Sequence, residues 1–349
     1  MADRKRYRGS YGNRRRQQNR RKILIVAGLL GLVILAAVLY ILQLRRDDFR
    51  TGRRAADENA EEAYDTAEDS DVVWYDGKAY RYNEHLSNYL LMGVDTKGDI
   101  HIDRQAEGGG QADTIYLLSY DRREEILRVL ALPRDTMTPI TITDDDGTEE
   151  GEAVMPLCLQ YAYGDGRRKS CELMCGAVSH LFYGIPVNGY ASVNLDSLPH
   201  LAELLGGVQV TLPDDSMADV NPSWKEGTVV TLDAENAEAF LRHRDKEAEL
   251  SAWTRMNRQK VFVRAFADQL RSMQQQDAGT VTRVFQGLQP YMITNMGNDI
   301  FADLVTGKQE GGITTLPGED VTTDNWDEFH VSEEELYALI IETFYREAG

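Results

Sequence analysis

The most apolar segment of the chain is residues 23–44, which read ILIVAGLLGLVILAAVLYILQL without a charged side chain. A helix of about 20 apolar residues, at 1.5 Å rise per residue, spans the ~30 Å hydrocarbon core of a bilayer. A cleaved signal peptide would have an apolar core of ~7–15 residues and a small-residue cleavage site. This core is longer and is followed by Arg45 and Arg46. The pattern therefore predicts one uncleaved transmembrane helix.

The charges on either side of this segment predict its orientation. Residues 1–22 contain ten Arg or Lys side chains and one acid, Asp3. Under the positive-inside rule this basic tail is cytoplasmic, and everything after Leu44 is extracellular. Residues 45–70 are rich in Asp, Glu, Ala and Arg and have few large apolar side chains, which is typical of a flexible acidic tether. Residues 71–349 then form an extracellular domain on a single-pass plasma-membrane protein.

In the outer domain, short β-branched and apolar runs alternate with segments that have helix start and stop signals. Strands are expected at 72–82 (a hairpin around Asp76 and Gly77), 88–95, 114–120, 126–132, 189–195 and 208–212. Helices are expected at 170–183, 197–205, 233–241, 253–275, 279–291 and 332–346, with Ser170, Asp233 and Ser332 as N-caps and Glu335 completing a capping box. The acidic residues 144–152 are expected to form a loop. Interleaved strands and helices predict an α/β domain, with helices packed on a central sheet.

The net charge of the outer domain indicates which kinds of partner it can bind. The whole chain has a net charge of −19 and the first 22 residues carry +9, which leaves −28 for the rest. A surface this acidic repels phosphate backbones, so we expect no nucleic-acid partner. Such a surface suits divalent cations, although acidity also simply keeps a domain soluble.

The cysteines do not describe a disulfide framework, because Cys158, Cys171 and Cys175 are odd in number. Cys171 and Cys175 lie four apart on an expected helix, where disulfide geometry is poor. A bond from Cys158 to one of them and three buried thiols are both compatible with the sequence.

Two carboxylates flank a glycine-rich polar segment between expected strands. Asp95 follows the first strand and Asp113 precedes the second. Strand ends beside loops are where α/β proteins place ligands. Two hard oxygen ligands with open positions suit Mg²⁺, which keeps waters and binds substrate phosphates. Either aspartate alone could instead be a turn residue or a cap.

Arginines gather in three short motifs of this acidic domain. Arg134 follows a strand in PRD, Arg242 and Arg244 form RHR, and Arg255 and Gln259 lie in RMNRQ, four residues apart on one helix face. Guanidinium forks bind phosphate oxygens bidentately. The alternative is surface salt bridges with the plentiful acids.

Six ordered segments resemble the LytR–CpsA–Psr family: NYLLMGVDTKGD, GQADTIYLLSYD, RVLALPRDT, YAYGDG, GYASVNLDSLPHLAELLGGVQVTLP and LRHRDKEAELSAWTRMNRQ. The resemblance covers about residues 85–345. The layout of basic tail, single span and outer domain matches as well. We therefore identify the chain as a member of this family.

The resemblance implies an extracytoplasmic phosphotransferase of the Gram-positive envelope. Such enzymes move a glycopolymer, for example teichoic acid or capsule, from a polyprenyl pyrophosphate carrier to a sugar hydroxyl of peptidoglycan, with Mg²⁺ (or Mn²⁺) assisting. It implies a central mixed sheet surrounded by helices, with the lipid chain in an apolar pocket. By position, Asp95 and Asp113 match the metal-associated aspartates. The expected catalytic residues are these two aspartates and Arg134. The expected pyrophosphate-binding residues are Arg134, Arg242, Arg244, Arg255, Gln259 and Gln111.

The chain departs from the family pattern at three places. The Arg of the usual Arg-x-Asp-Thr is Gln111, which removes a positive charge beside the expected phosphate. A Lys-x-Asn is replaced by Pro156 and Cys158, and an Asp-x-Gly-Arg by the segment that runs from Ala252 to Arg255. Two functions therefore stay open. One is a glycopolymer transferase, with activity reduced by Gln111. The other is a slow or non-catalytic relative that binds polyprenyl-linked polymer or scaffolds envelope assembly.

The expected topology gives a first prediction. Protease added to intact protoplasts should remove the domain that follows Leu44, because that domain faces outward. An epitope on residues 1–22 should stay protected, and both parts should be digested after detergent lysis. A C-terminal domain that resists protease on intact protoplasts would contradict this orientation.

Overall fold

The computed structural model describes residues 72–98, 110–144, 146–245, 251–323 and 327–348, which belong to one compact unit. The expected tail (1–22), transmembrane helix (23–44) and tether (45–70) lie outside the described residues. Within the ranges that are described, no helix is long and apolar enough to cross a membrane.

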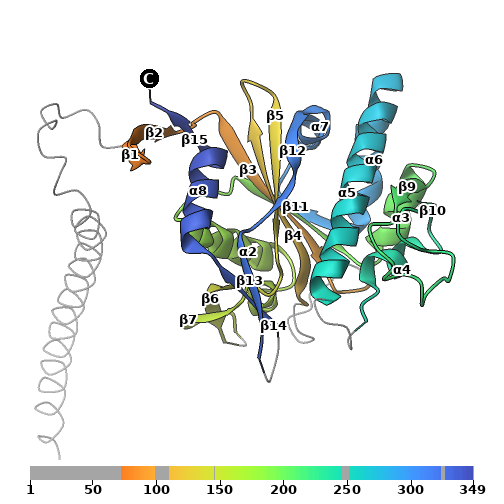
Figure 1. Cartoon of the computed structure of the whole chain (residues 1–349), viewed down its shortest axis with the longest axis horizontal. Coiled ribbons are helices and arrows are strands. Elements are labelled where there is room, and N and C mark those ends of the chain that lie inside the picture. The colour runs from red at the N-terminus through yellow and green to blue at the C-terminus, as the bar shows by residue number, and fades with distance from the viewer. Residues whose placement is uncertain (1–71, 99–109, 145, 246–250, 324–326, 349) are drawn as a thin grey trace, which may run out of the picture. The chain divides into compact units, whose positions relative to one another are not determined.

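The centre of the domain is a six-stranded mixed sheet with the order β11-β8-β3-β4-β5-β12 (Figure 1). Its antiparallel middle consists of β3 (Leu86–Val94), β4 (Ala112–Asp121) and β5 (Ile126–Leu132). On the two sides, β8 (Gly189–Asn194) runs parallel to β3, and β12 (Lys308–Thr315) runs parallel to β5. The edge strand β11 (Met292–Thr294) pairs antiparallel with β8. The predicted central mixed sheet is therefore confirmed.

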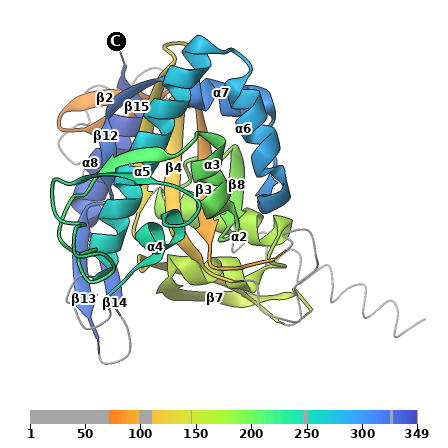
Figure 2. The ribbon, with the colours of Figure 1, turned by 90° about the vertical axis from the view of Figure 1, so that its right-hand side faces the viewer.

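Helices cover both faces of this sheet (Figures 1 and 2). One face packs against α3 (Ser197–Leu204), α4 (Ala237–Arg242), α5 (Ser251–Gln276), α6 (Thr280–Leu288) and α7 (Asn298–Thr306). The other packs against α2 (Arg168–Leu181), α8 (Glu333–Phe344) and the 3₁₀ helix η1 (Leu157–Tyr163). Alternation along β4 supplies both cores, since Tyr116 and Leu118 face the first and Ile115 and Leu117 face the second. A second 3₁₀ helix, η2 (Gln289–Tyr291), leads into β11.

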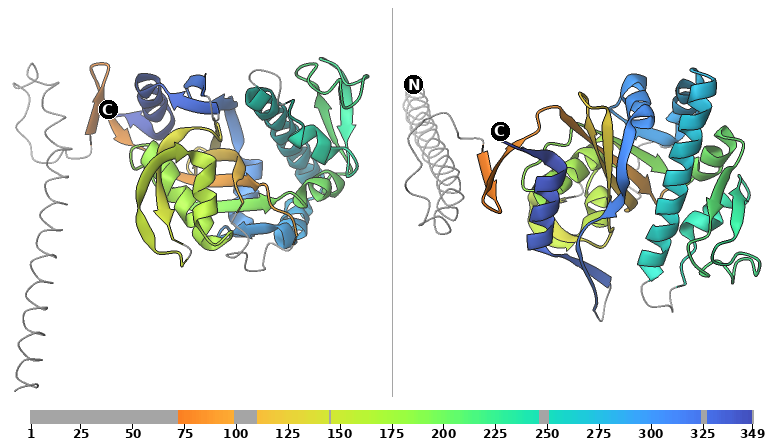
Figure 3. Two further views of the ribbon diagram at one scale, coloured as in Figure 1. Left: turned by 90° about the horizontal axis from the view of Figure 1, so that it is seen from below. Right: turned by 45° about the horizontal axis from the view of Figure 1, so that its top comes forward.

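Four smaller sheets lie outside the central sheet in the part of the chain that the structure describes. The predicted hairpin at 72–82 forms as β1 (Val72–Tyr75) and β2 (Lys78–Tyr82), and β15 (Tyr345–Glu347) adds a third strand. Asp76 and Gly77 turn the hairpin with φ of 47° and 73°. Three further pairs are β6 (Met137–Thr143) with β7 (Glu149–Pro156), β9 (Val208–Thr211) with β10 (Val229–Leu232), and β13 (Gly318–Thr322) with β14 (Asp327–Val331). Figure 3 shows β9 and β10 on the outer side of α5.

The structure corrects the expected loop at 144–152. Residues from Glu149 onward form strand β7 of a surface hairpin. Its first four residues are exposed, so the strand carries no apolar alternation that would have marked it.

The expected helix starts also need correction. α2 begins at Arg168, and its first amides are met by Asp165, whose Oδ1 accepts from the N–H groups of Arg167 (2.8 Å) and Lys169 (3.0 Å). Ser170, expected as the N-cap, lies buried inside the helix. Ser332 does precede α8, but its side chain makes no capping hydrogen bond, so the capping box is wrong. α4 starts at Ala237, four residues after the expected cap.

One buried cation fixes the segment that carries the RHR motif. Arg258 of α5 is 1% exposed. Its Nε donates to the carbonyl of Phe240 at 3.1 Å, and its two Nη groups donate to the Ser216 hydroxyl and the His243 carbonyl. The end of α4 is thereby tied to α5, so Arg258 of the RMNRQ motif has a structural role.

Arg258→Ala should therefore lower the stability of the purified full-length protein by about 3 kcal/mol, because two buried carbonyls lose their donor. Urea unfolding followed by tryptophan fluorescence measures this. Arg264→Ala on the same helix is the control, since the Arg264 side chain is 67% exposed. Equal unfolding midpoints for the two variants would contradict the structural role.

Candidate functional site

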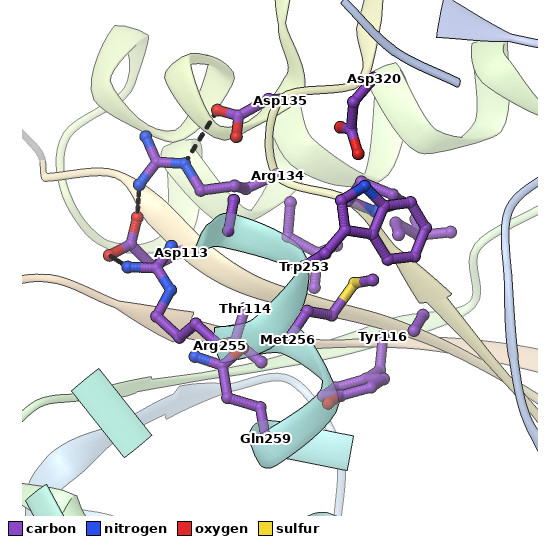
Figure 4. Close-up of a pocket in the computed structure, with 15 residues that line it drawn as sticks. Asp113, Thr114, Tyr116, Arg134, Asp135, Trp253, Arg255, Met256, Gln259 and Asp320 are labelled. Carbon is purple, nitrogen blue, oxygen red and sulfur yellow. Dashed lines mark hydrogen bonds and ion pairs between the residues drawn. The ribbon is translucent and has the colours of Figure 1, made fainter. Parts of the chain in front are cut away.

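The candidate site lies where β3, β4, β5 and α5 meet. The pairing of Val94 with Ala112 brings the end of β3 beside the start of β4. Pro133 ends β5 and leaves Arg134 in the loop that follows. The first turns of α5 bring side chains to the same place (Figure 4), where a cavity of about 440 Å³ is lined by Asp113, Thr114, Ile115, Tyr116, Ala131, Leu132, Pro133, Arg134, Asp135, Ala252, Trp253, Arg255, Met256, Gln259 and Asp320.

Arg134 is held on every side of its guanidinium group. Nη1 forms an ion pair with Asp113. Nη2 donates to Oε1 of Gln111 at 2.7 Å and contacts Sγ of Cys158 at 3.2 Å. Nε donates to Oδ1 of Asp135 at 3.1 Å. These partners fix the plane of the guanidinium group at the wall of the cavity.

Arg255 shares the same carboxylate. Its Nη1 lies 3.6 Å from Oδ2 of Asp113, across from Arg134. Burial, then the nearby charges of Arg134 and Arg244, lower the pKa of Arg255 to about 10. Burial is the larger cause, and the neighbouring cations add to it. Two guanidinium groups that share one carboxylate have the donors to bind a further anion.

Asp95 is tied to the segment that carries Gln111. Oδ1 of Asp95 accepts from the Gln111 amide at 2.6 Å, and the Asp95 amide donates to the Gln111 carbonyl at 3.1 Å. Gly110 makes this approach possible, since its φ is +76° and a Cβ there would lie 2.3 Å from the side chain of Thr96. Both aspartates therefore reach the same end of the β3–β4 pair.

These carboxylates fit a divalent cation only with help from a ligand. Among the residues that the structure describes, no group of three or more His, Cys, Asp or Glu side chains could hold a metal ion. Mg²⁺, however, commonly uses one or two carboxylates and completes its shell with water and substrate phosphates. Asp95 and Asp113 are carboxylates of this kind, although both oxygens of Asp113 face guanidinium groups in this structure.

The other expected binding residues lie at different distances from the two cavities: Gln259 and Arg242 line a cavity, and Arg244 does not. Gln259 lines the cavity and donates to the Leu241 carbonyl at 3.3 Å. Arg242 pairs with Glu238 at 2.8 Å and lines a second cavity. Arg244 pairs with Asp327 of β14 at 2.8 Å and does not line either cavity.

The second cavity is large and apolar. It covers about 1210 Å³, open solvent at its mouth included, between α5 and the strands β3, β4 and β8. Its wall is mostly hydrophobic, and its polar members are Asp113, Thr114, Asn194, Arg242, Arg255 and Gln259, with the hydroxyl-bearing Tyr116. A third cavity of about 790 Å³ continues from it along α5, and the two share Leu91, Tyr116, Val263, Phe266 and Phe301. The arginine pair with its shared carboxylate therefore lies at the mouth of an apolar cleft.

The sequence did not predict that Asp135, Cys158 and Asp320 lie at the site. Asp135 directly follows Arg134 and could have been found from the PRD motif. Cys158 comes from η1 and is buried as a neutral thiol, because burial raises its pKa to about 11. Asp320 comes from β13, far along the chain, and no local motif marks it. Cys158, Cys171 and Cys175 are all free thiols.

Known proteins share both the sequence and the fold of this domain. Among curated relatives, the polyisoprenyl-teichoic acid–peptidoglycan teichoic acid transferase TagU of Halalkalibacterium halodurans is 29% identical over 182 residues, which is 52% of each chain. TagT of Bacillus subtilis is 26% identical over 192 residues, 53% of this chain and 52% of the relative. In these alignments the chain spans about half the length of the curated relatives it matches.

Solved structures show the same architecture. The protein gbs0355 from Streptococcus agalactiae superposes with a TM-score of 0.58 at 21% identity, covering 74% of this chain and 86% of that one. TagV of B. subtilis gives a TM-score of 0.55 at 21% identity, covering 75% and 98%. A structure described as TagT bound to LI-WTA gives a TM-score of 0.54 at 21% identity, covering 74% of this chain and 90% of that one.

The sequence profile of the LytR_cpsA_psr family matches residues 50–343. The chain belongs to the LytR–CpsA–Psr family.

Proposed function

We propose that this protein transfers a polyprenyl-pyrophosphate-linked anionic glycopolymer, such as teichoic acid or capsule, to a hydroxyl of peptidoglycan. The observation that carries the proposal is the arginine pair at the mouth of the apolar cleft. Arg134 and Arg255 share Asp113, and Arg255 lines both the small polar cavity and the large apolar one. A ligand with a pyrophosphate head and a long apolar tail matches that arrangement. Relatives named as teichoic acid transferases support the same substrate class.

The energetics favour a lipid-linked donor. Burying a prenyl chain contributes ~0.8 kcal/mol per CH₂, so the apolar lining of the cleft favours a lipid-linked substrate. Guanidinium groups at the mouth then place the pyrophosphate rather than provide the affinity alone. Phosphoryl transfer depends on such positioning and on charge neutralisation more than on covalent chemistry by the protein.

The residues of the site take different roles in this proposal. Arg134 and Arg255 bind pyrophosphate oxygens, with Gln111 and Gln259 holding the ligand or its arginines in place. Arg242 lines the apolar cleft. Arg244, which pairs with Asp327, lies close enough to Arg255 for its charge to act there. Asp95 and Asp113 would hold Mg²⁺ (or Mn²⁺), which when bound neutralises phosphate charge.

The proposed location follows from the same donor. A polyprenyl carrier stays in the membrane, so the enzyme must work at the membrane surface. We propose that residues 23–44 anchor the chain with the N-terminus in the cytoplasm, the domain outside, and membrane lipid and peptidoglycan as its partners. The test of the whole proposal is transfer by the purified full-length protein, in detergent, from a synthetic lipid-linked pyrophosphate donor to peptidoglycan fragments.

A slow or non-catalytic relative that binds polyprenyl-linked polymer is the second candidate. The observation in its favour is Gln111, a neutral amide whose Oε1 accepts from Arg134 at 2.7 Å. A cation at this position would face developing phosphate charge, whereas the amide only orients its neighbour. Loss of one such charged contact can cost several kcal/mol of transition-state stabilisation.

Asp113→Asn tests the shared carboxylate. The amide keeps the shape but leaves Arg134 and Arg255 without their common anion. We expect the unliganded variant to melt at a lower temperature, because two buried cations now repel each other. We expect inorganic pyrophosphate to raise the melting temperature of the variant more than that of the wild type, and turnover to fall about 10²-fold. Unchanged melting and turnover would show that the carboxylate is dispensable.

Gln111→Arg tests whether the neutral amide limits the rate. We expect kcat to rise and donor affinity to change little, because the added charge meets the phosphoryl group mainly in the transition state. Gln111→Met is the matched control, since it removes the Arg134 acceptor without adding charge. Steady-state kinetics and donor titration measure both effects.

The outcomes separate the two candidate functions. Transfer by the wild type, faster in Gln111→Arg than in Gln111→Met, supports the transferase. Donor binding without transfer in all three proteins supports the lipid-binding relative. Absence of donor binding would exclude both.

A further inference from the structure

The two cavities that meet at Asp113 are lined by different elements beyond it. Their shared wall consists of Asp113, Thr114, Tyr116, Arg255 and Gln259. From there the apolar cleft continues over β3 and β8 and, through the third cavity, along α5, whereas the small polar cavity is lined by the loop after β5, the first turns of α5 and β13. An in-line displacement at phosphorus needs the nucleophile and the leaving group on opposite sides. If the lipid leaving group occupies the cleft, the acceptor hydroxyl enters through the polar cavity.

Three carboxylates line that polar cavity, and two of them are occupied by arginine. Asp113 pairs with Arg134 and Arg255, and Asp135 accepts from Arg134. A carboxylate bound to a guanidinium group is a weak proton acceptor, because the cation stabilises its charged form. The side-chain carboxylate of Asp320 has no hydrogen bond or ion pair to any residue that the structure describes.

The fold holds Asp320 firmly at this cavity. Asp320 lies on β13 directly opposite Phe329 of β14. Phe329 is fully buried, packs edge-on against Trp253 with ring centroids 5.7 Å apart, and donates its amide to the Asp135 carbonyl at 2.8 Å. Figure 4 shows the Asp320 carboxylate at the same end of the cavity as Asp135, beside Trp253.

The surroundings of Asp320 make it a better base than an ordinary aspartate. Burial, followed by the negative charges of Asp135 and Asp327, raises its pKa to about 6. The arginines on the cavity wall, Arg134 and Arg255, are already engaged with Asp113. Above pH 6 the Asp320 carboxylate is therefore ionised and able to take up a proton.

We infer that Asp320 is the proton acceptor for the acceptor hydroxyl in the transfer reaction. The hydroxyl oxygen forms a new bond to the glycopolymer-bearing phosphorus, and the bond from that phosphorus to the bridging pyrophosphate oxygen breaks. The electron pair leaves with polyprenyl phosphate, and the hydroxyl proton goes to Asp320. This inference rests on the proposed function. It adds a residue from the β13–β14 hairpin to a site otherwise built from β3, β4, β5 and α5.

Asp320→Asn tests the inference in the full-length protein with the lipid-linked pyrophosphate donor and peptidoglycan fragments. We expect the wild-type kcat to rise with pH through an acidic limb near 6, where Asp320 loses its proton. The variant should lose that limb and 10²-fold or more of kcat, with donor affinity within twofold of wild type. Glu319→Gln is the matched control, because Glu319 is the exposed neighbour on β13.

A folding defect is excluded by a separate measurement. The pKa of Asp320 is raised in the folded state, so ionisation above that pKa opposes folding. Asp320→Asn should therefore melt at the same or a higher temperature than wild type at pH 8. Asp320→Glu should recover part of the turnover, with the acidic limb restored, which a purely structural role would not produce.

Failure of this inference differs from failure of the proposed function. Wild-type transfer together with a fully active Asp320→Asn that keeps the acidic limb overturns the inference alone. A wild-type protein that binds donor and transfers nothing overturns the transferase proposal and the inference with it. Transfer that loses its acidic limb only in Asp320→Asn and not in Glu319→Gln supports both.

Discussion

The carboxylate of Asp113, held between two guanidinium groups, is the contact on which the site depends. Arg134 reaches it from the loop after β5, and Arg255 reaches it from α5, so one anion joins the sheet to its longest helix. Without an anion at this point the two cations would repel each other in a half-buried place. The arrangement keeps the cavity formed before substrate arrives, and it keeps Arg134 in one orientation through Gln111, Cys158 and Asp135.

The sequence predicted the central sheet well because its strands are short apolar runs that end in turn residues. β5 was placed at its observed ends, and β4 and β8 to within two residues. The prediction failed for elements whose sequence lacks the apolar periodicity of a buried strand or helix, although the fold makes them part of the structure. β7 is an exposed acidic ribbon, and β12 contains Gly311 and Gly312, so neither shows the alternation of a buried strand. α7 and the β13–β14 hairpin were missed as well, since their burial comes from packing against distant segments.

The site residues show the same difference between local motifs and contacts that only the fold creates. Residues in compact motifs, such as Arg134 after its strand and Arg255 with Gln259 on one helix face, were expected together and lie together. Arg244 was expected beside them on the strength of the RHR motif; its charge acts on Arg255, while its guanidinium group pairs with Asp327 of β14. Asp320 was not expected, because nearly two hundred residues separate it from Asp135 and only the fold makes them neighbours. Sequence motifs report local geometry and cannot show which distant carboxylate competes for a cation or faces the same cavity.

The exchange of partners at Asp113 links these contacts to the proposed chemistry. In the unliganded protein the carboxylate takes the place that phosphate oxygens would take, since both are anions that guanidinium groups bind in the same way. A pyrophosphate that engages Arg134 and Arg255 would release Asp113 from them. The released carboxylate would then be available, together with Asp95, for a divalent cation that the same phosphates help to hold. In this proposal, cation and donor would therefore bind cooperatively.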